Sequence, residues 1–177
     1  KLMKKAGCVR IHYGVESGSQ RVLNVLRKGI TIQQVKKAFK YSRKLGITTL
    51  GYFIIGSPTE TRKEIMRSIR FAKELKADFV HFAVMTPFPA TELYRLGLQN
   101  GVLKNDFWRE FAKNPTEDFV PQHWEENFTK DELVEMMKFA YKSFYLRPDY
   151  IIKRLFKVRS VYEILKKGKV ALRLFKY

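Results

Sequence analysis

The sequence predicts an α/β fold: half of a parallel α/β barrel, built from three βα units and followed by a mainly helical extension. Strand-like segments begin near residues 8, 47 and 78, and a segment with helical periodicity follows each of them. Such alternation is typical of parallel strands joined by crossover helices. The first strand is polar on one face, whereas parallel strands between two helical layers are apolar on both. A barrel lumen that holds a ligand explains this polar face.

The first unit consists of the strand CVRIHYGVE (8–16) and a helix expected over residues 19–27. Along this strand Val9, Ile11, Tyr13 and Val15 alternate with a second set of residues on the opposite face. That second set is polar apart from one glycine and comprises Arg10, His12, Gly14 and Glu16.

The next units repeat this order with clear helix boundaries. Thr31 and Gln34 form a capping-box pair for a helix that Gly46 ends, and ITTLGYFIIG (47–56) is the second strand. Thr61 and Glu64 form another pair for the helix that runs to about residue 75. The third strand, DFVHFAVMT (78–86), leads into a short helix that stops near residue 101.

The pattern changes after residue 101, so we expect two regions: barrel units over 1–101 and a helical extension over 102–177. Within the extension, Thr129 and Glu132 cap an amphipathic helix, and the last 30 residues indicate one or two basic helices. Three units are too few to close a barrel. The chain also opens at Lys1 in what reads as the end of a helix, so we expect a fragment whose amino-terminal barrel half is the missing partner.

Composition restricts the classes of protein. The chain has 177 residues, is 45% hydrophobic and carries a net charge of +18, which is concentrated in residues 1–50 and 147–177. Its single cysteine, Cys8, allows neither a disulfide framework nor a cysteine-based metal site and suits the cytoplasm. The longest apolar run falls short of the roughly 18 residues that a transmembrane helix needs. The three histidines (12, 81 and 123) are scattered, so we expect no metal site.

Turns rich in Gly, Ser, Pro and Thr follow all three strands: GVESGS, IIGSPTET and TPFPAT. Ligands of parallel α/β folds bind at this edge, where the carboxyl ends of the strands meet. Such turns let the main chain approach a flat ligand such as adenine, and a carboxylate such as Glu16 accepts both hydroxyls of a ribose. Each turn alone has a second explanation, in which its hydroxyl residues only cap the helix that follows: Ser17, Ser19, Thr61 and Thr91. Three such turns after three successive strands favour a ligand site.

The stretches AGCVRIHYGVESGSQRVLNVLRKGITIQQV, GYFIIGSPTETRKEI and TPFPATELY together resemble the carboxyl-terminal half of a radical S-adenosylmethionine (SAM) enzyme. They are most similar to the branch with an upstream cobalamin-binding domain, which includes the anaerobic magnesium-protoporphyrin cyclase-like proteins. The resemblance covers residues 1–101, and FYLRPDYIIKRL resembles the extension of that branch. It implies a partial (β/α)6 TIM-like barrel of which these are the last three strands.

The resemblance also implies cofactors and site residues. The family holds a [4Fe–4S] cluster on a C-x-x-x-C-x-x-C loop that this chain lacks, and reductive cleavage of SAM there yields a radical that abstracts substrate hydrogen. Cobalamin is a further cofactor of the whole protein in that branch. The implied SAM-binding residues are Glu16, Ser17 and Ser19 near the ribose and methionine, and Ile54, Gly56, Thr86 and Pro87 around the adenine. Thr59 and Ala90 stand where the family usually has glycine, so a positive φ there would be strained.

Three functions remain open at this point. The first is a fragment of a radical SAM enzyme, inactive alone, whose whole protein is an oxidoreductase or methyltransferase-type enzyme acting on a small molecule. The second is a basic module that binds nucleic acid or an anionic surface, because basic and aromatic residues interleave in the tail. The third is a phosphate-sugar barrel enzyme that uses the GSP turn as an anion nest.

Overall fold

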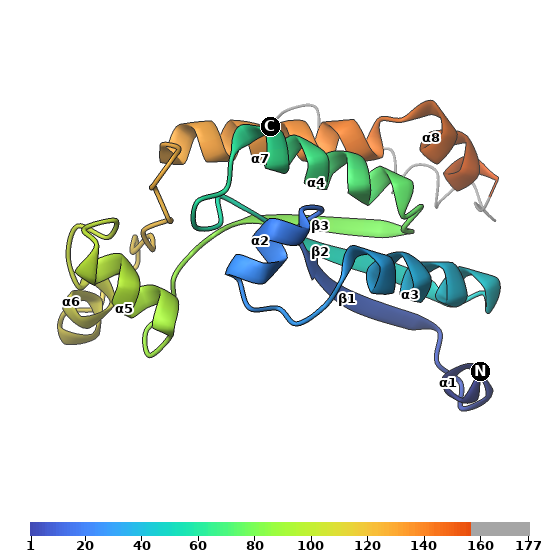
Figure 1. Ribbon diagram of the computed structural model, residues 1–177, viewed down its shortest axis with the longest axis horizontal. Coiled ribbons are helices and arrows are strands. Elements are labelled where there is room, and N and C mark those ends of the chain that lie inside the picture. Colours follow the sequence, from blue (N-terminus) through green and yellow to red (C-terminus); the bar gives the residue numbers. More distant parts are fainter. Residues whose placement is uncertain (157–177) are drawn as a thin grey trace.

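The computed structural model describes residues 1–156, so most of the predicted basic tail (157–177) lies outside the described residues. Three strands form one parallel sheet: β1 (Arg10–Glu16), β2 (Thr48–Ile55) and β3 (Phe79–Val84). Their order in the sheet is β1-β2-β3, as Figure 1 shows. The predicted architecture of three adjacent parallel βα units is therefore confirmed.

Helices connect the strands at the predicted places. After α1 (Leu2–Lys5), the β1–β2 connection holds α2 (Gln20–Val25) and α3 (Ile32–Lys44), and the β2–β3 connection holds α4 (Arg62–Glu74). The capping boxes predicted for α3 and α4 are both formed, because each threonine accepts the amide of the residue three positions on. In each box the N3 side chain bonds back to the threonine amide, which satisfies two otherwise unpaired backbone donors.

The hydrophobic core lies between one face of the sheet and helices α3, α4 and α7 (Lys130–Tyr145). Val15, Phe53 and Phe82 of the three strands are at most 1% exposed. They belong to one cluster with helical residues such as Phe39 and Leu133. The opposite face carries exposed polar and aromatic side chains, namely Arg10, His12, Tyr52 and His81. The polar face predicted for β1 is therefore the open face of the sheet.

The remaining helices are α5 (Glu92–Gln99), α6 (Phe107–Lys113) and α8 (Pro148–Leu155). Helix α7 shares the core with the sheet and lies along β3, where tyrosine hydroxyls bind the strand's outer edge. Tyr145 Oη accepts the Val80 amide over 3.0 Å and donates to the Val80 carbonyl over 2.7 Å. Tyr141 makes the same pair of bonds to Phe82. The β3 edge is thereby closed, so a barrel can continue only beyond β1.

Among the helices of residues 1–156, none is long and apolar enough to cross a membrane.

Candidate functional site

The three predicted turns meet at one edge of the sheet. Glu16 ends β1, Gly56 follows β2 directly, and Thr86 comes two residues after β3. The parallel pairing of β1 with β2 and of β2 with β3 places all three strand ends at the same edge. The sequence prediction that these turns lie together therefore holds, and each contributes differently.

Glu16 reaches back along the open face of the sheet. Its backbone has a positive φ of 64°. A Cβ added to Gly14 would lie only 2.7 Å from Glu16 Oε1, so the carboxylate lies directly over that glycine. Lys28 Nζ donates to the same oxygen over 2.7 Å. Within the described residues Oε2 has no partner. The helix cap that follows is made by Ser19, which accepts the Val22 amide, so Glu16 is not the cap of α2.

Ser17 and Ser19 face the protein interior instead. Both are at most 1% exposed. Ser17 Oγ lies 3.0 Å from Ser68 Oγ of α4 and accepts the Ser19 amide. Ser19 Oγ donates to Glu64 Oε1 over 2.8 Å. Their hydroxyls are engaged in joining the turn to α4, so any contact of this turn with a ligand would come from its main chain or from Glu16.

The turn after β2 encloses a buried acid. Glu60 is 0% exposed, and its Oε2 accepts the amides of Gly56 (2.9 Å) and Ser57 (3.1 Å). Its other oxygen, Oε1, and Ser57 Oγ are buried without a hydrogen-bond partner in the described part of the chain. Burial raises the pKa of Glu60 to about 7, against the lowering effect of the two amides. Near neutral pH this carboxyl is therefore partly protonated.

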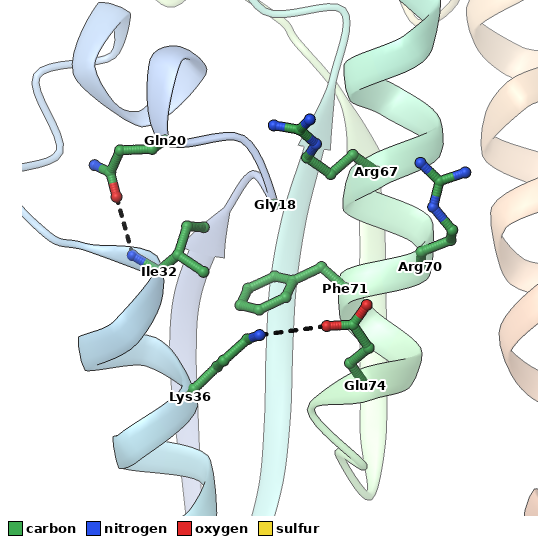
Figure 2. A pocket seen from close by; sticks show the side chains of 8 residues that line it. All are labelled: Gly18, Gln20, Ile32, Lys36, Arg67, Arg70, Phe71 and Glu74. Carbon is green, nitrogen blue, oxygen red and sulfur yellow. Dashed lines mark hydrogen bonds and ion pairs between the residues drawn. The ribbon is translucent and has the colours of Figure 1, made fainter.

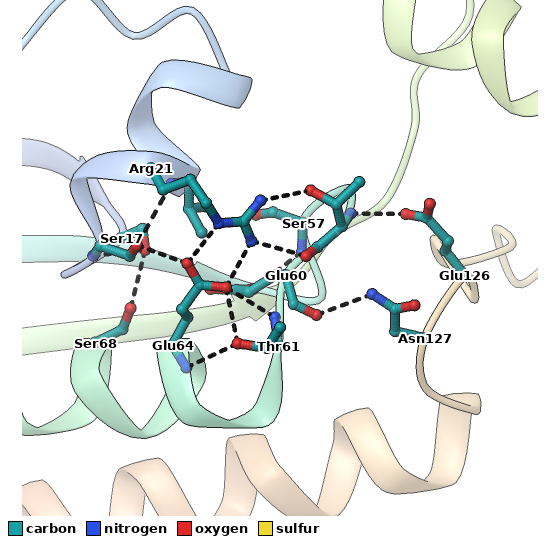
Figure 3. A network of polar contacts seen from close by, with 12 residues as sticks. Ser17, Arg21, Ser57, Glu60, Thr61, Glu64, Ser68, Glu126 and Asn127 are labelled. Atoms are coloured by element: carbon teal, nitrogen blue, oxygen red, sulfur yellow. Dashed lines mark hydrogen bonds and ion pairs between the residues drawn. The ribbon is translucent and has the colours of Figure 1, made fainter.

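The same turn adopts the glycine-type backbone at Thr59. Its φ is 56°, and Ala90 in the third turn has a φ of 63°, so both turns keep the left-handed conformation despite having a side chain. Arg21 of α2 holds Thr59 through Nη1 to its hydroxyl (2.9 Å) and Nη2 to its carbonyl (2.8 Å). The guanidinium also pairs with Glu64 at 2.6 Å, which keeps the pKa of that carboxyl well below its usual range. Figure 3 shows this network joining α2, the turn and α4.

The third turn is joined to the extension. Thr86 Oγ1 donates to the Val84 carbonyl over 3.2 Å and lies 3.0 Å from His123 Nδ1. Because the hydroxyl has one proton, the ring supplies the hydrogen of the second bond through Nδ1. Burial and the nearby Lys130 lower the pKa of His123, which favours this neutral ring. The Pro87 carbonyl accepts Trp108 Nε1 over 3.0 Å.

Of the predicted residues, Glu16 lies on the open face, and alternation along β2 places half-buried Ile54 on that face as well. Gly56 is buried with a φ of 80°, and a Cβ there would lie 2.7 Å from Leu133. Sequence reasoning missed the partners that shape these turns: Arg21, Lys28, Glu60, His123, and Glu126, whose carboxylate accepts the Thr59 amide over 2.7 Å. The only signal in the sequence was that Thr59 and Ala90 stand at positions where glycine is usual, and both adopt a positive φ.

The chain does not fit an iron–sulfur cluster by itself. Cys8 precedes β1, at the opposite end of the strand from the three turns, and its thiol donates to the Arg10 carbonyl. In residues 1–156 no three His, Cys, Asp or Glu side chains gather as metal ligands would. Any cluster ligands must come from other residues of the protein.

Comparison with known proteins settles the family. Residues 1–72 match the profile of the radical SAM superfamily. These residues of the chain belong to this superfamily. It is 41% identical over 156 residues (88% of the chain and 33% of the relative) to an uncharacterized methyltransferase of Pyrococcus horikoshii. It is 31% identical over 94 residues (53% and 17%) to the anaerobic magnesium-protoporphyrin IX monomethyl ester cyclase of Rubrivivax gelatinosus.

A third relative is the bacteriochlorophyllide d C-8(2)-methyltransferase of Chlorobaculum tepidum, which is 28% identical to the chain over 117 residues. That match covers 63% of the chain and 25% of the relative. The chain thus spans a third or less of the length of these three relatives. The resemblance predicted from the three turns is confirmed at the level of the superfamily.

Proposed function

We propose that this chain supplies half of the SAM site of a radical SAM enzyme and is inactive without the rest of the barrel. The supporting observation is the Glu16 carboxylate, which lies on the open sheet face with one oxygen held by Lys28 and the other without a partner in the described residues. A ribose offers two hydroxyl donors to such an acceptor. Half-buried Ile54 offers apolar surface on the same face for adenine.

The turns supply the main-chain part of this site. Gly56 and Thr86 follow two neighbouring strands at the Glu16 edge. Pro87 comes next in a turn that His123 and Trp108 hold in place. Ser17 and Ser19 would act by fixing the first turn against α4. The chain's own residues thus bind and orient SAM, while a cluster bound elsewhere in the protein supplies the electron for its cleavage.

The whole protein, on this proposal, is a cytoplasmic oxidoreductase or methyltransferase-type enzyme acting on a small molecule. The methyltransferase and cyclase names of the relatives support that range. Cobalamin in a further domain belongs to the same proposal. The alternative of a phosphate-sugar enzyme is less favoured, because the GSP turn directs its Gly56 and Ser57 amides to Glu60 and not outward to an anion.

Calorimetric titration of the full-length protein with SAM tests the proposal. Glu16→Ala should weaken SAM binding by about one to two decades, since hydrogen bonds to a charged group contribute roughly 1.5–3 kcal/mol each before ordering costs. Glu16→Gln should lie between the wild type and Glu16→Ala. Lys28→Ala removes the partner and keeps the acceptor, so it should cost less than Glu16→Ala.

Thermal melting of the same variants provides the control. Glu16 and Lys28 form a partly exposed ion pair, and such pairs stabilise proteins by about 0–1 kcal/mol. All three variants should therefore melt close to the wild type. If melting drops in the Glu16 variants while SAM affinity is unchanged, Glu16 serves the fold and the proposed site loses its main residue.

A further inference from the structure

Helices α3 and α4 together carry ten basic residues and only two acids. The exposed or half-buried bases of α3 are Lys36, Lys37, Lys40, Arg43 and Lys44, and the helix has no acid. The bases of α4 are Arg62, Lys63, Arg67, Arg70 and Lys73. The two acids of α4 are already paired, Glu64 with Arg21 and Glu74 with Lys36. This surface therefore concentrates much of the chain's positive charge.

A pocket of about 320 Å³ lies between the two helices and brings three of these bases together. Figure 2 shows Lys36 of α3 directed to Glu74, while Arg67 and Arg70 lie further along α4 on the other side of the pocket. The Lys36–Glu74 distance is 3.5 Å, and Lys36 Nζ also lies 5.7 Å from the centre of the Phe71 ring. In residues 1–156 neither Arg67 nor Arg70 has a carboxylate partner. Three cations with one carboxylate leave an excess of positive charge that an anion would neutralise.

We propose that this groove binds the phosphate backbone of a nucleic acid. Guanidinium groups offer forked donors that match phosphate oxygens, and two of them stand three residues apart on one helix face. Thirteen-residue helices are about 20 Å long, so the basic surface spans roughly six phosphates of one strand at their 3.4 Å spacing. A single phosphate group would need only the pocket. Because the basic residues continue along both helices, they fit a chain of phosphates better.

A lipid surface is the weaker occupant on the same observations. Of the large apolar side chains that are exposed, Tyr41 alone lies on these two helices within the described chain. Amphipathic helices that lie in a membrane interface bury an apolar face, and α3 and α4 bury theirs in the core instead.

Gly18 and Gln20 also line the pocket, so the groove begins beside the turn that carries Glu16.

Fluorescence anisotropy of the full-length protein with a labelled RNA oligonucleotide tests the inference. The triple variant Lys36→Ala, Arg67→Ala, Arg70→Ala should bind about ten-fold or more weakly at moderate salt. The slope of log affinity against log salt concentration should fall by about 2–3, because each lost phosphate contact removes roughly 0.9 for a duplex and 0.7 for a single strand. Single-stranded and duplex oligonucleotides identify which form the groove prefers.

The matched control removes the same charges elsewhere: Arg95→Ala, Arg109→Ala and Lys113→Ala on α5 and α6, all exposed. It should change affinity far less than the groove variant. Equal losses in both triple variants, or absence of RNA binding by the wild type, would overturn the inference. So would binding to vesicles of phosphatidylcholine and phosphatidylserine that is as tight as RNA binding and equally sensitive to the groove variant. SAM affinity should be unchanged in both variants, which separates this test from that of the Glu16 site.

Discussion

The backbone amide of Thr59 donates a 2.7 Å hydrogen bond to Oε2 of Glu126, a residue of the carboxyl-terminal extension (Figure 3). The same oxygen accepts Trp124 Nε1 over 2.9 Å. Asn127, the next residue, donates to the Glu60 carbonyl over 3.1 Å. The extension therefore holds the turn after β2 from outside while Arg21 holds it from α2.

Glu126→Ala should destabilise the protein by about 1–2 kcal/mol, because the Thr59 amide and the Trp124 indole lose a shared charged acceptor. Hydrogen exchange of the Thr59 amide should also become faster. Urea unfolding of the full-length protein and amide exchange measure the two effects. Glu126→Gln, whose carbonyl oxygen can still accept, should be milder. Glu117→Ala removes an exposed acid without a described contact, and a Glu126→Ala variant no worse than this control would contradict the prediction.

Ala90 and Thr59 both adopt a left-handed backbone that costs a side chain roughly 1–2 kcal/mol. Ala90→Gly should therefore stabilise the protein by about 0.5–1 kcal/mol, after the entropy that glycine adds to the unfolded chain. Thr59→Gly should gain less, because it also loses the hydrogen bond from Arg21 Nη1. Differential scanning calorimetry measures both. Ala112→Gly in α6 is the control and should destabilise, and loss of stability in Ala90→Gly to the same extent would show that its φ carries no strain.

The features predicted from sequence were those that short stretches determine. The capping boxes at Thr31, Thr61 and Thr129 involve residues three apart, and all three form. Strand order followed from the alternation of strands and helices, because crossover connections place successive strands side by side. The glycine that is usual at residue 59 indicates a left-handed backbone, and Thr59 keeps it with a φ of 56°.

The contacts that shape the site join residues far apart in the chain. Arg21 and Glu64 are separated by 43 positions, and Glu126 lies 67 positions after Thr59. Neither pair leaves a periodic signal, since a surface arginine and an exposed glutamate occur on most helices and loops. The bonds from tyrosine hydroxyls to the β3 edge also leave no signal in the sequence, because a tyrosine such as Tyr145 is an ordinary residue of an amphipathic helix. Only the fold shows which of these polar groups meet.

Glu60 is another residue whose surroundings the sequence does not reveal. The sequence predicts that it lies in a turn, whereas the fold buries its carboxyl group. Its pKa of about 7 means that the folded chain holds this proton more tightly than the unfolded chain does. The stability that Glu60 contributes is therefore complete below its ordinary pKa and is lost as the pH rises towards 7. Glu64 acts in the opposite sense, since its lowered pKa gives stability that is lost on acidification.

Glu60→Gln isolates the Glu60 effect. The amide keeps an oxygen that accepts the Gly56 and Ser57 amides, but it does not titrate. Relative to this variant, the wild type should lose about 2–3 kcal/mol of unfolding free energy between pH 5 and pH 8, because a pKa shift of one unit is worth about 1.4 kcal/mol. Urea unfolding of both proteins across that range gives the difference directly, and the contribution of Glu64 cancels because both proteins retain it. A difference that is constant with pH would show that Glu60 is ionised throughout, so that the two amides and Arg21 outweigh its burial.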